Sequence, residues 1–104
     1  MKDMKNKASK LAITGGKGFR MEFDNGYSLS IQIGPGNYCD NYGGDRGWHV
    51  KPPSQYSIES TTCEIAIINP ESERIPLPEN NDQTVKAYVP VSEIPEWITY
   101  ASNL

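Results

Sequence analysis

The sequence predicts a small α+β domain, in which an antiparallel sheet of about four to five strands carries one C-terminal helix packed on it. Three observations support this fold class: alternating apolar residues over 19–33, a mostly apolar run over 62–69, and apolar residues at helical spacing after residue 92. Because 104 residues with 37% hydrophobic composition suit one modest core, we expect one domain.

The first observation predicts a β-hairpin with a three-residue loop. Apolar residues occupy every second position on both sides of Asp24-Asn25-Gly26. A two-residue turn at Asn25-Gly26 would set apolar side chains opposite polar ones. A three-residue loop with a left-handed Gly26 instead pairs apolar residues across the strands, namely Phe23 with Tyr27, Met21 with Leu29 and Phe19 with Ile31.

The other predicted strands are one strong central strand and three weaker ones. Residues 11–14 are expected to form a short strand, and residues 62–69 a central strand, since both of its faces carry apolar side chains. A turn over 69–73 leads to residues 74–77, which the prolines at 76 and 78 confine to an edge. Residues 84–89 form another predicted strand, with Val85, Ala87 and Val89 on one face and Tyr88 on the other.

The chain is predicted to end in an amphipathic helix. Ser92 is a suitable N-cap, and Pro95 fits the first turn, where its missing N–H would have no intrahelical partner. The apolar side chains that share one face of this helix are Ile94, Trp97, Ile98, Ala101 and Leu104. A helix this short is marginal alone in water, so we expect it to bury this face against the sheet.

Charge divides the chain into a basic start and an acidic remainder. Residues 1–10 carry four lysines and one aspartate and are expected to be a flexible tail, followed by a single domain over 11–104. The formal net charge of −3 argues against duplex nucleic acid as a partner. No apolar run approaches the roughly 20 residues of a membrane helix, so a cytoplasmic location is expected, with Cys39 and Cys63 as thiols.

The segment 34–61 is predicted to be a long loop that holds the binding site. It combines five glycines and three prolines with aromatic side chains, a composition unlike that of plain disorder. Aromatic rings and arginine offer stacking faces, and asparagine offers donors and acceptors. The candidate binding residues are Asn37, Tyr38, Asn41, Tyr42, Arg46 and Trp48. If Trp48 instead belongs to the core, we expect the site on the outward face that bears Ser28, Ser30 and Gln32.

Catalysis is the weaker alternative. Cys39 as nucleophile and His49 as base are the right residue types for a thiolate mechanism, but one histidine and two cysteines give such a set by chance. The competing interpretation is that Cys39 packs as a small apolar residue. No cysteine or histidine spacing typical of a metal site is present, and no metal or cofactor is expected.

Three motifs resemble those of small uncharacterised proteins encoded by tailed bacteriophages and prophages. They are NGYSLSIQIGPGNYCDN over 25–41, CEIAIIN over 63–69 and VKAYVPVSEIPEWI over 85–98. The resemblance implies an accessory protein, of a kind that in some cases inhibits bacterial immunity by binding an effector or sequestering a nucleotide signal. It implies a host bacterial cytoplasm as the location, and it supplies no catalytic residues.

Function is therefore expected to be binding rather than catalysis. The first hypothesis is a phage accessory protein that inhibits bacterial immunity by binding a host protein. The alternatives are a sponge for a small nucleotide-like ligand and a cysteine-dependent hydrolase that uses Cys39 and His49. A sheet this small with uncovered edges also suggests a homo-oligomer.

Overall fold

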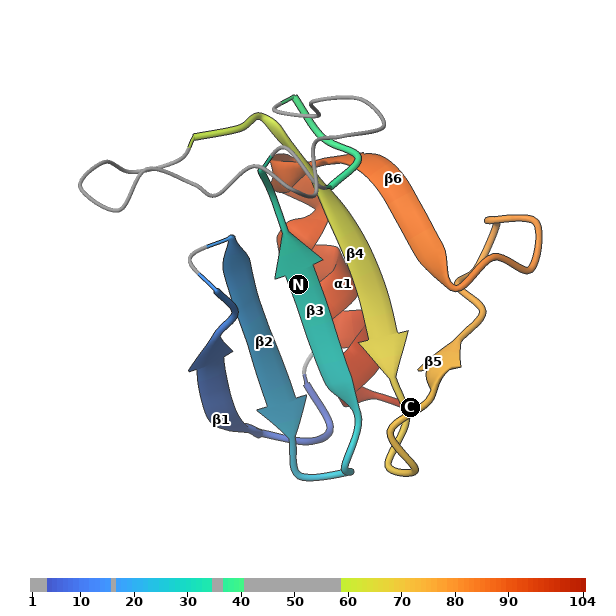
Figure 1. The fold of residues 1–104 in the computed structure, drawn as a ribbon. Coiled ribbons are helices and arrows are strands. Elements are labelled where there is room, and N and C mark those ends of the chain that lie inside the picture. Colours follow the sequence, from blue (N-terminus) through green and yellow to red (C-terminus); the bar gives the residue numbers. More distant parts are fainter. Residues whose placement is uncertain (1–3, 16, 35–36, 41–58) are drawn as a thin grey trace.

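The computed structural model describes residues 4–15, 17–34, 37–40 and 59–104 (Figure 1). Within them, six strands precede a short 3-10 turn and a C-terminal helix. In chain order these are β1 (Ala8–Ile13), β2 (Gly18–Phe23), β3 (Ser28–Gln32), β4 (Thr62–Ile68), β5 (Arg74–Ile75), β6 (Val85–Pro90), η2 (Val91–Glu93) and α1 (Ile94–Ser102). No helix in the described part of the chain is long and apolar enough to cross a membrane.

All strands join one antiparallel sheet, and α1 packs on one of its faces. The strand order is β1-β2-β3-β4-β5, with β6 also paired to β4. Figure 1 shows α1 lying behind β3 and β4, while the other face of these strands carries no helix among the described residues. The predicted α+β class is confirmed, with six strands rather than four or five.

The central hairpin has the predicted register. Phe19 pairs with Ile31 and Met21 with Leu29, and the Phe23 amide donates to the Tyr27 carbonyl at 2.9 Å. Gly26 has a φ of +85°, the left-handed conformation that the three-residue loop requires. The pairing of apolar residues across the strands therefore did select the turn.

The core lies between α1 and the middle of the sheet. Its inner layer comes from alternate residues of β3 and β4, and Leu29, Ile65 and Ile67 are almost fully buried. Trp97 and Ala101 supply the helix side of the same cluster. β4 is central as predicted, because β3 pairs along one of its edges and β5 and β6 share the other.

The expected faces of β6 are wrong because the strand contains a β-bulge. Cys63 pairs with Val89 but Ile65 pairs with Lys86, so two residues of β6 oppose Glu64 alone. Tyr88, at the bulge, has a φ of +52°. The extra residue breaks the alternation and places Val89 in the core. Val85 lies opposite Ala66 on the other face, and Lys86 has its Nζ 5.3 Å from the centroid of the Trp97 ring.

Two boundaries also differ from expectation. β1 begins at Ala8, three residues earlier than expected, so residues 8–10 of the expected tail pair with β2. The backbone carbonyl of Lys7 also accepts a hydrogen bond from the amide of Asp24, which ties this segment to the hairpin turn. Ser92 is not the helix N-cap, because a 3-10 turn precedes α1 and Glu93 occupies the cap position without a side-chain hydrogen bond.

Replacing Gly26 by Val should lower the free energy of unfolding by about 2 to 4 kcal/mol, measured by chemical denaturation. A β-branched residue is strained at a φ of +85°, and a Cβ at this position would lie 3.0 Å from Cγ of Pro70. Gly15→Val is the matched control, since Gly15 has a φ of +58° and a Cβ added there would meet no atom within 4 Å. Equal losses in the two variants would contradict the close approach to Pro70.

Candidate binding site on the open face of the sheet

The candidate site lies on the face of the sheet opposite α1, which we call the open face. Side chains on this face form three rows across the strands, one of which consists of Gln32 and Glu64 beside Gly18. The middle row is Ala12, Arg20, Ser30, Ala66 and Val85, and the third row is Lys10, Glu22, Ser28, Ile68 and Arg74. The pairing register alone produces this pattern, because the residues that flank each core residue along its strand point to the opposite face.

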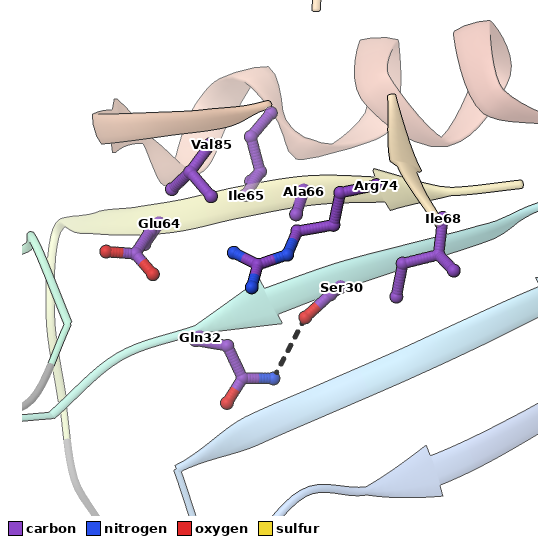
Figure 2. A pocket seen from close by; sticks show the side chains of 8 residues that line it. All are labelled: Ser30, Gln32, Glu64, Ile65, Ala66, Ile68, Arg74 and Val85. Carbon is purple, nitrogen blue, oxygen red and sulfur yellow. Dashed lines mark hydrogen bonds between the residues drawn. The ribbon is translucent and has the colours of Figure 1, made fainter. Parts of the chain in front are cut away.

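A shallow pocket of about 200 Å³ lies in this face where β3, β4, β5 and β6 meet. Figure 2 shows the side chain of Arg74 extending over Ala66, with its guanidinium group between Glu64 and Ser30. Ser30 and Ala66 are small and leave the floor low, while Gln32 and Ile68 line other parts of the pocket. The result is an open depression with a cationic group above its floor.

The guanidinium groups on the open face are not paired with any carboxylate in the described part of the chain. Among the residues that the structure describes, neither Arg20 nor Arg74 makes a side-chain hydrogen bond or ion pair. The carboxylate of Glu64 accepts the backbone amide of Tyr38 at 2.9 Å instead. With Lys10 and Glu22 included, the open face carries three cationic and two anionic side chains, in a chain with a formal net charge of −3.

Hydrogen bonds hold the polar side chains of the middle of this face in place. The Gln32 amide nitrogen donates to Thr14 Oγ1 at 2.7 Å and to Ser30 Oγ at 3.2 Å. Ser28 differs, because it is fully buried and its hydroxyl oxygen has no hydrogen-bond partner within the described ranges. An unpartnered buried hydroxyl costs stability, so Ser28 is a defect that the fold tolerates on this face.

The first residues of the predicted loop are bound to the residue that follows β3 and to β6. The Asn37 amide nitrogen donates to the Ile33 carbonyl at 2.8 Å. The Tyr38 carbonyl accepts the amide of Tyr88 at 2.9 Å, and the two rings lie 6.3 Å apart. Both rings are about half exposed, with 47% for Tyr38 and 50% for Tyr88. Asn37 thus has a structural hydrogen bond, whereas the half-exposed ring of Tyr38 lies beside the ring of Tyr88.

Asp40 links the segment 37–40 to the start of β4 by hydrogen bonds. Its carboxylate accepts hydrogen bonds from the amide and hydroxyl of Thr61 at 2.7 and 2.6 Å and from the hydroxyl of Thr62 at 2.7 Å. These bonds, chiefly those from the Thr61 and Thr62 side chains, lower the pKa of Asp40 to about 2. Residues 37–40 and 59–62 are therefore joined by hydrogen bonds at the two ends of the long loop, and we call these residues the loop base.

Both cysteines are buried thiols. Cys39 is 1% exposed and its Sγ donates to the Gly34 carbonyl at 3.6 Å. Burial, with smaller contributions from the nearby Cys39 and Glu93, raises the pKa of Cys63 to about 11. A nucleophile needs to be accessible and largely ionised, so the burial of Cys39 favours its interpretation as a small apolar side chain.

Only part of the predicted site can be located. Asn41, Tyr42, Arg46, Trp48 and His49 lie outside the described residues. The face bearing Ser28, Ser30 and Gln32, the second location considered from the sequence, is the open face itself.

The sequence patterns did not point to the two arginines of the open face. The position of Arg20 follows from the hairpin register, since it directly opposes Ser30. The position of Arg74 depends on pairing between β4 and β5, which no local pattern predicts.

The fold and site thus define a small α+β protein with a polar, arginine-bearing sheet face. Comparison with protein-family models, with curated proteins and with solved structures finds no significant match to this chain.

Removing the unpartnered hydroxyl by Ser28→Ala should raise the free energy of unfolding by about 1 kcal/mol in chemical denaturation. Ser30→Ala is the control, because its hydroxyl accepts a hydrogen bond from Gln32 and its loss should give no gain. A destabilised Ser28→Ala variant would mean that this hydroxyl has a partner in solution.

Asp40 should make stability depend on pH in the acid range. Its folded pKa of about 2 lies below the ordinary value of 3.8, so its contribution is complete above pH 4 and is lost as pH falls towards 2. Thermal melts of the wild type and Asp40→Asn should therefore differ most at neutral pH and converge towards pH 2. A constant difference in melting temperature from pH 2 to 6 would contradict this assignment.

Proposed function

We propose that this protein is a non-enzymatic binding protein whose open face holds an acidic group of a partner protein. The observation that carries the proposal is the guanidinium of Arg74, which lies above the small floor residues Ser30 and Ala66 without a carboxylate partner among the described residues. Arginine binds carboxylate and phosphate groups through paired N–H donors, and its strength in this role comes from that fixed geometry.

The size of the pocket favours a protein partner over a small nucleotide. Pockets that enclose drug-sized ligands have volumes of about 300 to 1,000 Å³, whereas the pocket beside Arg74 has about 200 Å³ and is open to solvent. Such a depression accommodates one carboxylate or phosphate group but does not enclose a nucleotide. A protruding acidic side chain on a larger surface fits it better, with the rest of the interface formed around the pocket.

The charge of the face supports the same choice. The open face has a local excess of one positive charge, too little for the several phosphate contacts that sustain binding to duplex nucleic acid. One or two arginines near the centre of an interface are, by contrast, typical of protein–protein hot spots. The half-exposed ring of Tyr38 would add contact area of the kind enriched in such interfaces.

The resemblance to phage accessory proteins suggests what kind of partner this protein binds. On that basis we propose as partner a host protein of bacterial immunity, in the host cytoplasm. The sponge and the hydrolase remain the competing functions. Native mass spectrometry of the protein purified from infected cells distinguishes a sponge from a protein inhibitor, because a sponge retains a small molecule and an inhibitor retains a host protein. The Cys39→Ala variant distinguishes a hydrolase from both binding functions, because only a hydrolase would lose activity while retaining its fold and its binding.

Charge reversal by Arg74→Glu should abolish capture of the partner, and Arg20→Glu should weaken it. Truncation of a central hot-spot residue typically costs about 2 to 4 kcal/mol of binding free energy, a loss of about 30-fold or more in affinity. The measurement is quantitative mass spectrometry of proteins crosslinked to the tagged chain in host cells. Residues 59–104 and the hairpin should keep their fold in these variants, since both arginines project from the sheet surface.

Lys7→Glu is the matched control, since it makes the same charge change at an exposed position outside the open face. The proposal predicts that a protein captured by the wild type is retained by Lys7→Glu and lost by Arg74→Glu. Equal capture by all three variants would place the binding surface elsewhere, with the segment 34–61 as the next location to test.

A further inference from the structure

β1 forms an edge of the sheet and carries the most exposed large apolar side chains of the described residues. Leu11 is 61% exposed and Ile13 is 75% exposed. Both lie on the same face as the core, beside Met21 and Phe19 of β2, but α1 packs farther along the sheet. We propose that β1 pairs antiparallel with β1 of a second copy of this chain, so that the two sheets join into one.

The backbone of β1 has amide and carbonyl groups that face the open edge of the sheet and could bond to another strand. The Thr14 amide donates to the Gly18 carbonyl at 3.0 Å, so Thr14 directs its polar backbone groups towards β2. Orientation alternates along an antiparallel strand, so Ala12 also faces β2, while Leu11 and Ile13 direct their amides and carbonyls to the open edge. The two most exposed apolar residues are therefore also the two that offer hydrogen bonds to a new strand.

The sequence of β1 is complementary to itself in one register. A two-fold axis at Ala12 sets Leu11 opposite Ile13 of the second copy and Ile13 opposite its Leu11. Each pair then exchanges two backbone hydrogen bonds and joins two apolar side chains. Lys10 lies opposite Thr14, and the two Lys10 side chains are four residues apart, about 13 Å, beyond the Debye length of about 8 to 10 Å. An axis at Leu11 would instead oppose Ile13 to Ser9 and bring the lysines about 7 Å apart.

A second copy is the occupant that the rest of the sheet favours. At the other side of the sheet, β5 has two residues and is followed by Pro76, and β6 ends at Pro90, so these strands offer little to a new strand. β1 is interrupted only by the irregularity between Ala8 and Lys10, which leaves 10–14 as a regular segment centred on Ala12. The regular part of β1 and the register in which it is complementary to itself are thus both centred on Ala12.

Dimerisation would also enlarge the open face. A second shallow pocket, of about 250 Å³ and lined by Lys10, Ala12, Arg20 and Glu22, lies against this edge. Pairing through Ala12 would place the same pocket of the second copy next to it. This consequence rests on the proposed function of the open face, whereas the pairing itself does not.

Sedimentation velocity of the full chain over about 10 µM to 1 mM tests the pairing, because an interface confined to one strand is small and dissociates in this range. The wild type should change from the mass of one chain to that of two. Leu11→Pro removes an amide that faces the open edge and Ile13→Lys places a charge in the apolar pair, so each should raise the dissociation constant at least about tenfold.

Two controls separate loss of pairing from loss of fold. Val91→Lys changes another exposed apolar residue away from β1 and should dimerise like the wild type. Ala12→Pro removes an amide that faces β2 and should lower the melting temperature, whereas Leu11→Pro should not. A wild-type chain that remains monomeric at 1 mM, or a dimer that Leu11→Pro and Ile13→Lys leave intact, would overturn the proposal. Neither result would depend on whether Arg74→Glu loses its partner.

Discussion

The rest of the structure depends on β4, which pairs with three other strands along its two edges and has side chains packed on both faces. Its inward residues Cys63, Ile65 and Ile67 are almost fully buried, while Glu64, Ala66 and Ile68 face the other way. A one-residue slip would bury Glu64 and expose the isoleucines, so the hydrophobic effect fixes the register against β3. Every other strand, and the position of α1, is then set directly or indirectly from this one.

The division of one edge of β4 between two short strands creates the candidate site. β6 pairs with its first half and β5 with its end, so the chain leaves the sheet between them. Arg74 lies at the start of β5 and extends back over Ala66, where a larger residue would fill the pocket. The bulge in β6 contributes from the other direction, because it turns Val85 towards the open face and leaves Lys86 on the helix side. The site is thus a consequence of irregular strand pairing and not of a loop.

The sequence pattern predicted those features of the fold that depend on residues close together in the chain. The hairpin register followed from matching Met21 to Leu29, a pairing that itself required a three-residue loop. The pairing partners of Arg74 involve residues far apart in sequence, so its position could not be derived from either segment alone. The bulge could not be predicted because Tyr88 is not a residue type that signals a positive φ, and only the finished sheet shows that two residues oppose Glu64. Residues 34–61 carry no sustained hydrophobic period from which a helix or a long strand could be predicted.

The loop base and the open face share one group, the carboxylate of Glu64. It lines the pocket beside Arg74, yet its hydrogen bond goes to the backbone amide of Tyr38. Asp40 holds the same segment through Thr61 and Thr62, so the position of the Tyr38 amide is fixed by bonds on both sides of it. The carboxylate keeps its negative charge in this hydrogen bond, and it forms no ion pair with Arg74 among the described residues. The first residues of the long loop therefore hold one of the side chains that line the pocket, even where their own side chains do not line it.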